Sequence, residues 1–270
     1  MIIVAGGCSF IHGDELQDWD VKTGSASTWP ALLSQDHDYR LVAGGGWSNQ
    51  GIARNVINEI SQIGRCGVIV QWTFPARYEF KFNYDTGQRS GHWYNIAPWV
   101  VEDDDFDPSV YFFEVDHKQK TLQNKHNERA RLTGVSDFAK TYLKHVGADM
   151  YWETYTTLKE ILYLQMYLKQ MSIPYMFTAA DNCIMDNHII QGGDPSIAAV
   201  YYSIDWEKFF WFPKGTHQGE TVAPRGFYQW AVENKYPMYT THPRESAHTA
   251  AAELIKDTFY DMVTQYSKQD

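Results

Sequence analysis

The sequence predicts an α/β fold in which a parallel sheet is covered by helices on both faces. Short, continuous apolar runs rich in β-branched residues alternate along the chain with longer segments whose apolar residues recur at helical spacing. Continuous apolar runs are typical of strands buried on both sides. Their alternation with helical segments favours parallel strands joined by helical crossovers.

Each expected element follows from its own pattern. Strands are predicted at residues 2–5, 39–43, 67–72 and 173–177. A helix start is predicted at 28–33, where Thr28 is the expected cap and Pro30 lies in the first turn. Further helices are predicted around 52–63, with Ser48 or Asn49 as the cap, around 158–168, around 226–234, and from His242 to the C-terminal region.

The length of 270 residues is expected to form one domain over residues 1–270. From about 81 to 150 the pattern becomes polar and aromatic, so we interpret this stretch as a long irregular insertion after the third strand. Its acidic run at 102–105 is typical of a solvated surface. Residues 181–225 are expected to be rich in loops.

The composition excludes several function classes. A net charge of −10 argues against a nucleic-acid partner and against binding to an anionic membrane surface. No apolar run reaches membrane-spanning length and no signal peptide is recognisable, so we expect the protein to be cytoplasmic at synthesis. Three scattered cysteines indicate reduced thiols. Most of the many aromatic residues are expected in the core, and the excess would suit a groove for flat or sugar-like ligands.

A serine between glycines follows the first strand, in the run Gly-Gly-Cys-Ser-Phe-Ile-His-Gly at residues 6–13. Glycines at such a turn permit a tight strand-to-helix connection that presents the Ser9 side chain. A helix cap is the alternative interpretation of a lone serine. The run lacks both the Lys-Ser/Thr ending and the glycine spacing of phosphate-binding loops, so we exclude that function.

A histidine at the other end of the chain is the candidate base, because a serine becomes nucleophilic only when a base takes its proton. His242 precedes Pro243 just before the last helix. We expect His242 to be the cap residue, with Glu245 as its capping-box partner. His248 is expected to be structural.

Candidates for stabilising a developing oxyanion follow the second and third strands. Gly46 ends a glycine triplet and would bring a backbone N–H close to the charge, since no Cβ blocks the approach. Asn49 would donate its side-chain amide, although helix capping is its more common use. Thr73 is either a hydroxyl donor or a turn residue. Ser9, Gly46 and Thr73 each follow a predicted strand, and functional groups gather at the carboxyl ends of parallel strands.

Taken in order, these blocks resemble the SGNH (GDSL-like) hydrolase superfamily. The family's Gly-Asp-Ser block matches Gly-Cys-Ser at 7–9, with Gly13 four residues on, and its second-block glycine matches Gly46. The third block matches residues 71–74 and the final His-Pro matches His242-Pro243. The Gly-Cys-Ser-Phe, Ser-Asn and Trp-Thr segments are similar to those of SGNH-like proteins of tailed phages.

The resemblance implies a three-layer, flavodoxin-like α/β/α fold and ester hydrolysis. Ser9 would attack an acyl carbonyl, His242 would act as base and then acid, and the Ser9 and Gly46 N–H groups with a third-block side chain would hold the oxyanion. Three positions depart from the family pattern: Cys8 replaces the aspartate, Thr73 replaces an asparagine, and Tyr239 stands where the acid that orients the histidine is expected. Glu233 or Asp181 could supply that acid, a backbone carbonyl could replace it, or it could be absent and leave a Ser-His dyad.

Two functions therefore compete. The first is a serine hydrolase that cleaves an ester through Ser9 and His242, with carbohydrate O-acyl esters as one candidate substrate class. The alternative is a non-catalytic SGNH-fold module that binds a glycan or joins a larger assembly, such as a homo-oligomer or a phage particle, and would then be virion-associated. No His-Glu-x-x-His pattern or compact Cys/His cluster indicates a metal, and no cofactor is expected.

Overall fold

The structure is a computed structural model of the chain. It describes residues 1–82, 92–98, 134–192, 194–213, 216–217, 220–221 and 224–267. The acidic run at 102–105 lies outside the described residues, as does much of the expected insertion.

The centre of the molecule is a four-stranded parallel sheet in the order β2-β1-β3-β6. Its strands are β1 (Ile2–Gly7), β2 (Asp38–Ala43), β3 (Gly67–Trp72) and β6 (Tyr175–Ala179). The strand predicted at 173–177 begins two residues later. Pro174 precedes it and has no N–H to donate to the ladder, although its carbonyl accepts a hydrogen bond from Val68 N at 3.0 Å.

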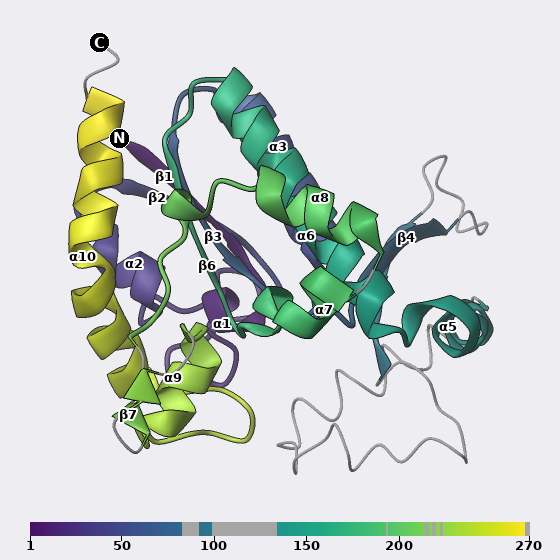
Figure 1. Ribbon diagram of the computed structural model, residues 1–270. Coiled ribbons are helices and arrows are strands. Elements are labelled where there is room, and N and C mark those ends of the chain that lie inside the picture. The colour runs from purple at the N-terminus through teal and green to yellow at the C-terminus, as the bar shows by residue number, and fades with distance from the viewer. Residues whose placement is uncertain are drawn as a thin grey trace.

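Helices cover both faces of this sheet and make three layers (Figure 1). One face carries α3 (Asn49–Ile63), α6 (Met150–Gln170) and α8 (Pro195–Ser203), and the other carries α2 (Trp29–Leu33), α9 (Phe227–Glu233) and α10 (Glu245–Ser267). The predicted α/β class, with a parallel sheet between helical layers, is confirmed.

Alternation along β1 explains why both layers form. Val4 belongs to the core under α3 and α6, whereas Ile3 and Ala5 belong to the core under α10. All three side chains are fully buried. Burying apolar surface stabilises a fold by about 25 cal/mol per Å². Because both faces of β1 bury apolar side chains, loss of either helical layer would expose them and destabilise the fold.

Several helices differ from the predicted ones. Helix α6 begins at Met150, eight residues before the predicted start, and Asp149 caps it by accepting from the N–H groups of Tyr151 and Trp152. The region expected to be rich in loops holds α7 (Asn187–Gly192), α8 and two 3-10 turns, η4 (Cys183–Met185) and η5 (Trp206–Lys208). Asp194 and Pro195 form the start of α8, the Asp194 side chain accepting from Ser196 N.

Contacts also show which of the expected cap residues of α3 and α2 act as caps. Ser48, and not Asn49, caps α3, because its side chain accepts from Gly51 N. Thr28 lies at the cap position of α2 but donates instead to Ser25 O.

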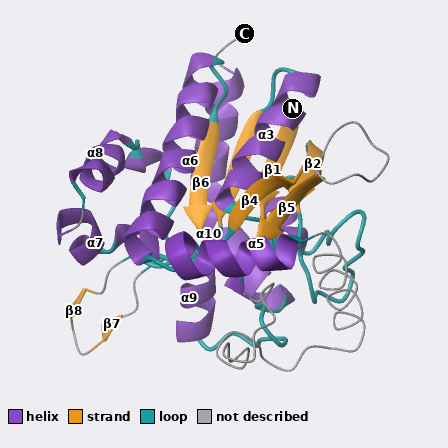
Figure 2. Ribbon diagram, turned by 90° about the vertical axis from the view of Figure 1, so that its right-hand side faces the viewer, coloured by secondary structure: helices purple, strands orange, loops and turns teal. Residues whose placement is uncertain are grey.

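The described parts of the expected insertion form a small unit beside α3, on the side away from α10 (Figures 1 and 2). It consists of the hairpin β4 (Tyr78–Phe82) and β5 (His92–Ile96), the helix α5 (Val135–Tyr142) and the π-helical turn η3 (Leu143–Gly147). A small hydrophobic cluster joins them, formed by Tyr78, Tyr94, Ile96, Val135 and Ala139. A short hairpin is formed by β7 (Thr216–His217) and β8 (Glu220–Thr221).

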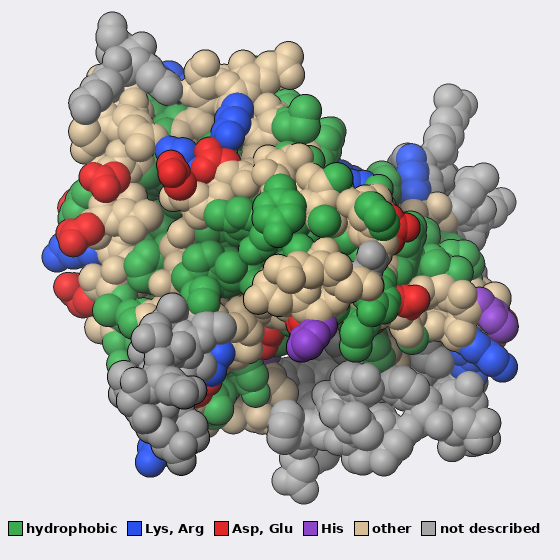
Figure 3. All heavy atoms as spheres, in the orientation of Figure 1, with side chains coloured by type: hydrophobic (Ala, Val, Ile, Leu, Met, Phe, Trp, Pro, Cys, Tyr) green, Lys and Arg blue, Asp and Glu red, His purple; other side chains and the backbone are tan. Residues whose placement is uncertain are grey.

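Among the described residues, no helix combines the length and apolar character needed to cross a bilayer. On the face drawn in Figure 3, acidic and basic side chains are interspersed and do not form a basic stripe.

Candidate active site

Ser9 lies at the carboxyl edge of the sheet, where β1 turns into the single-turn helix α1 (Ser9–His12). Gly13 ends this turn with φ +76°, a left-handed conformation that a side chain would strain. A Cβ on Gly13 would also lie 2.5 Å from Ser25 Cβ. The local sequence therefore fixes a tight turn that carries Ser9 at its start.

The loop before α10 reaches the same place. The ring of Phe10, the residue after Ser9, lies 4.8 Å from the His242 ring between centroids. Phe10 also contacts Phe74, which follows β3, and Tyr228 of α9, at 6.2 and 5.9 Å. Folding thus brings the first turn and the last loop of the chain into one cluster.

A carboxylate holds the His242 ring in place. Glu15 Oε2 lies 2.9 Å from His242 Nδ1 and also accepts from the backbone N–H groups of His242 and Thr241, each at 3.0 Å. Because Nδ1 faces a carboxylate, it is the nitrogen that carries the proton, and Nε2 is the nitrogen able to act as a base.

The expected capping box is wrong. Helix α10 begins at Glu245, so His242 lies outside it and is not the cap residue. The Glu245 carboxylate accepts from Gln17 N at 2.9 Å and from the Tyr239 hydroxyl. The backbone N–H of His242 is instead bound by Glu15, because the turn after α1 inserts its carboxylate into this loop.

Sequence reasoning missed Glu15, and the two acids it named have other partners. Glu233 pairs with Arg225 at 2.7 Å, and Asp181 accepts from Cys183 N at 2.8 Å. A separation of 227 residues hides the contact between Glu15 and His242 from any local pattern. The only signal was an acidic side chain six residues after the candidate nucleophile.

The loop after β2 lies against the turn that follows α1. A Cβ on Gly45 would lie 2.7 Å from Asp14 Oδ2, so only glycine fits there without a shift. Gly46 has φ +74°, which also requires glycine. The structure therefore packs the glycine triplet beside the Ser9 turn.

The loop after β3 is fixed by Asn49. The Asn49 amide donates to Thr73 O and to Thr157 Oγ1, both at 3.1 Å, and its carbonyl accepts from Thr73 N at 2.8 Å. With both amide hydrogens bound to protein atoms, Asn49 positions Thr73. It could donate to an oxyanion only by releasing one of these bonds.

The Thr73 hydroxyl is free to form a hydrogen bond with a ligand. Its Oγ1 is buried and has no hydrogen-bond partner in the described part of the chain, and the residue is 4% exposed. Leaving a buried hydroxyl unpaired costs about 1–3 kcal/mol. An unsatisfied donor of this kind, just past β3, is a feature that ligand binding would explain.

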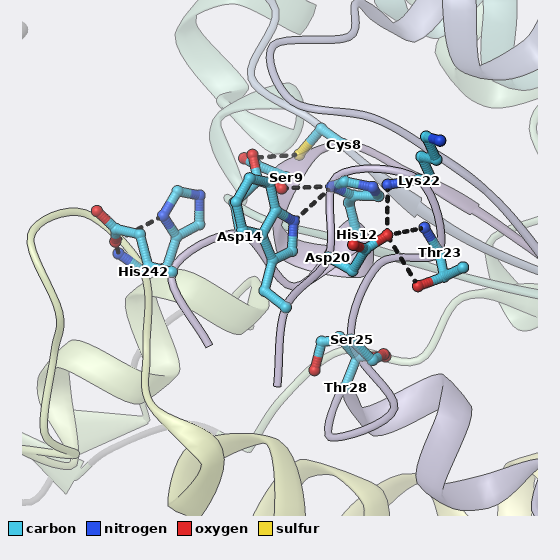
Figure 4. A network of polar contacts seen from close by, with 12 residues as sticks. Cys8, Ser9, His12, Asp14, Asp20, Lys22, Thr23, Ser25, Thr28 and His242 are labelled. Atoms are coloured by element: carbon cyan, nitrogen blue, oxygen red, sulfur yellow. Dashed lines mark hydrogen bonds and ion pairs between the residues drawn. The ribbon is translucent and has the colours of Figure 1, made fainter. Parts of the chain in front are cut away.

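Ser9 Oγ is not hydrogen-bonded to His242 in this structure. The hydrogen bond that it makes among the described residues is a donation to Cys8 Sγ, at 4.0 Å (Figure 4). Hydrogen bonds between catalytic groups are often long in proteins without substrate and shorten when substrate binds. The arrangement thus supplies a hydroxyl and an oriented imidazole in one neighbourhood.

Two further side chains that sequence reasoning did not select lie close to Ser9. Arg77 stands over the Phe74 ring at 5.4 Å. Burial lowers the pKa of Arg77, and the neighbouring Cys8 and Asp14 counteract this shift. His12 contacts Asp14 and Trp19 through Nδ1, next to the Ser9 turn (Figure 4).

Across the described residues, no group of three His, Cys, Asp or Glu side chains is arranged to hold a metal ion.

Comparisons with known proteins give weak likenesses. No protein-family model and no curated protein matches the chain. A psychrotrophic esterase, EstA, from Pseudoalteromonas sp., in a structure inhibited by monoethylphosphonate, is 10% identical with a TM-score of 0.44, over 99% of this chain and 98% of that one. A member of the lipolytic protein G-D-S-L family from Veillonella parvula is 12% identical with a TM-score of 0.42, over 96% and 98%. At these values neither likeness bears on the chemistry of this chain.

Proposed function

We propose that this protein is an SGNH-type serine hydrolase that cleaves an ester. Ser9 attacks the acyl carbonyl while His242 Nε2 takes the hydroxyl proton. His242 then returns the proton to the leaving alcohol, and water repeats the sequence on the acyl-enzyme to release the acid. The observation that carries the proposal is the packing of His242 against Phe10, beside Ser9, with Nδ1 bound to a carboxylate.

The oxyanion that forms in each step needs donors already in place. In this proposal they are the N–H groups of Ser9 and Gly46 and the hydroxyl of Thr73. The unpartnered state of Thr73 Oγ1 supports its part. Asn49 contributes by holding the Thr73 backbone.

The substrate class that we propose is a small-molecule or glycan ester, including carbohydrate O-acyl esters. The aromatic side chains around Phe10, those of Phe74 and Tyr228, would suit an apolar or sugar-like group.

Two measurements test the function. The protein should hydrolyse p-nitrophenyl acetate and should be labelled by a fluorophosphonate probe at Ser9, and Ser9→Ala should lose both properties. Circular dichroism of each sample controls for folding. A folded protein that neither hydrolyses the ester nor takes the label would contradict the proposal and favour the non-catalytic module. Glycan arrays would then test glycan binding by that module. Light scattering would test its assembly into an oligomer or a virion.

A further inference from the structure

We propose that Glu15 is the acid that orients His242 and stabilises its protonated form during catalysis. Its carboxylate comes from the turn after the nucleophile and not from the loop before the histidine. This inference rests on the proposed serine-hydrolase function. It makes Glu15 a positioning residue, since it acts through His242. The position three residues before His242 is Tyr239, whose N–H donates to His242 O at 2.8 Å and whose hydroxyl donates to Glu245.

The geometry of the contact matches this role. One oxygen, Oε2, accepts from the ring Nδ1 and from the backbone N–H of the same residue, so both the ring and its backbone are fixed. The Thr241 N–H adds a third bond. The side chains are nearly buried, with 7% of Glu15 and 13% of His242 exposed. Screening by water is therefore weaker than at the surface.

The backbone at Glu15 indicates that the contact is maintained against strain. Glu15 has φ +73°, a left-handed conformation that costs a residue with a side chain about 1 kcal/mol or more. In the described chain only Ser172 and Lys235 share such a φ without being glycine, and both lie exposed just after helices. Glu15 is different because its side chain is buried and its carboxylate points into the His242 loop.

The carboxylate is charged in the folded protein. Burial alone would raise the pKa of Glu15, but the hydrogen bonds from His242 and Thr241 and the charge of the imidazole outweigh it and lower the pKa. A buried anion on the far side of the ring stabilises the imidazolium that forms when His242 takes the proton of Ser9.

A purely structural role is the alternative, in which Glu15 only ties the first turn to the last loop. The variant Glu15→Gln separates the two roles. Its amide oxygen can accept every hydrogen bond that Oε2 accepts, so a structural tie survives, whereas the negative charge is lost. Glu15→Asp keeps the charge but shortens the reach by one methylene.

The experiment compares Glu15→Gln and Glu15→Asp with a control variant, Ser172→Gly. Ser172 also has a left-handed backbone, but it is exposed and distant in sequence from the site. Ester turnover, melting temperature and the downfield proton resonance of the His242 ring N–H are measured for each, with His242→Ala to assign that resonance. We expect Glu15→Gln to lower kcat by about 10²-fold or more with KM little changed, since replacing the acid of a serine triad by its amide costs about 10⁴. The resonance should move upfield, Glu15→Asp should recover part of kcat, and Ser172→Gly should match the wild type.

Folded Glu15→Gln with wild-type kcat and an unmoved resonance would overturn the role of Glu15 while leaving the hydrolase intact. Should Glu15→Gln fail to fold, wild-type kcat in folded Glu15→Ala, which lacks both the charge and the contact with His242, would overturn it instead. Failure of the hydrolase itself is recognised separately, by wild-type protein without ester turnover or Ser9 labelling.

Discussion

Two histidines six residues apart show how the surroundings decide what an imidazole can do. His242 lies in the loop before α10, beside Phe10, with Nδ1 on the Glu15 carboxylate. His248 lies inside α10 and is 1% exposed. Its Nδ1 accepts from Trp29 N at 3.2 Å, and its ring lies 4.8 Å from that of Phe227.

The difference lies in what each Nδ1 requires. The His242 Nδ1 donates to an anion, so a second proton on the ring strengthens the contact. The His248 Nδ1 is an acceptor, so protonation would break its bond to Trp29. Burial, with the nearby charge of His242, lowers the pKa of His248 to about 3. Of these two histidines, His242 therefore has the contacts that a catalytic base needs.

The largest expected difference in kcat comes from removing the imidazole rings of His242 and His248 in separate variants. We expect His242→Ala, like Ser9→Ala, to lower kcat by roughly 10⁴–10⁶-fold, because a serine hydrolase loses most of its rate without its base or nucleophile. His248→Asn should leave kcat close to wild type, since the Asn oxygen can replace Nδ1 as the acceptor for Trp29. Steady-state hydrolysis of p-nitrophenyl acetate checks all three. Equal losses in His242→Ala and in folded His248→Asn would break the comparison.

Two threonines near Asn49 allow a similar contrast for the oxyanion donors. Thr73 Oγ1 is unpartnered among the described residues, whereas Thr157 Oγ1 accepts from Asn49. We expect Thr73→Val to lower kcat by about 10²-fold, the cost of one oxyanion donor, without loss of stability. Thr157→Val should instead cost about 1–3 kcal/mol of stability, because it leaves an Asn49 hydrogen unpaired. Steady-state kinetics and urea unfolding of both variants test these two predictions. Unchanged kcat in Thr73→Val would show that Thr73 is not an oxyanion donor.

The buried histidine predicts how stability depends on pH. Between its ordinary value of 6.5 and its folded value of about 3, the unfolded chain binds the proton and the folded protein does not, so stability falls as the pH falls. From pH 7 to pH 5 this accounts for a loss of about 2 kcal/mol. The free energy of unfolding of His248→Asn should therefore fall by about 2 kcal/mol less than that of the wild type between pH 7 and pH 5. We expect the variant to be less stable than the wild type at pH 7.

Urea unfolding at pH 7 and pH 5 measures the difference. The Glu15 carboxylate does not interfere, because its lowered pKa places its own contribution below about 4.5, where stability is lost as the pH falls through the folded value. An unchanged pH 7-to-5 difference in His248→Asn would contradict the assignment of this acid sensitivity to His248.

The smallest effect is expected at the second carboxylate next to the His242 loop. Glu245 accepts from Gln17 N and from the Tyr239 hydroxyl but does not contact His242. We expect Glu245→Gln to cost under about 1 kcal/mol, mainly through lost interaction with the N-terminus of α10, and to leave kcat unchanged. Melting temperature and kcat measured beside Glu15→Gln would show whether the two carboxylates differ as their contacts indicate.

Local patterns were sufficient for most of the fold. The strand at 2–5, the helix around 52–63 and the strand at 67–72 were predicted because burial imposes a period on the sequence, and that period is visible within ten or so residues. Helices α7 and α8 were missed, because short helices in a polar segment carry little periodicity. At the site, Gly46 and Thr73 were selected for their places after strands, and both lie where that rule puts them. Their roles in binding an oxyanion remain predictions.

By itself the sequence determined the sheet and most of the helices that cover it, and with them the edge to which Ser9, Gly46 and Thr73 belong. Only the tertiary structure decided that Glu15 holds His242, that the Asn49 amide binds Thr73 and Thr157, and that His248 Nδ1 accepts from Trp29 N. Periodicity and capping act between residues a few positions apart, and the sequence displays them directly. A hydrogen bond across 227 residues depends on how every intervening element packs, so no local segment records it.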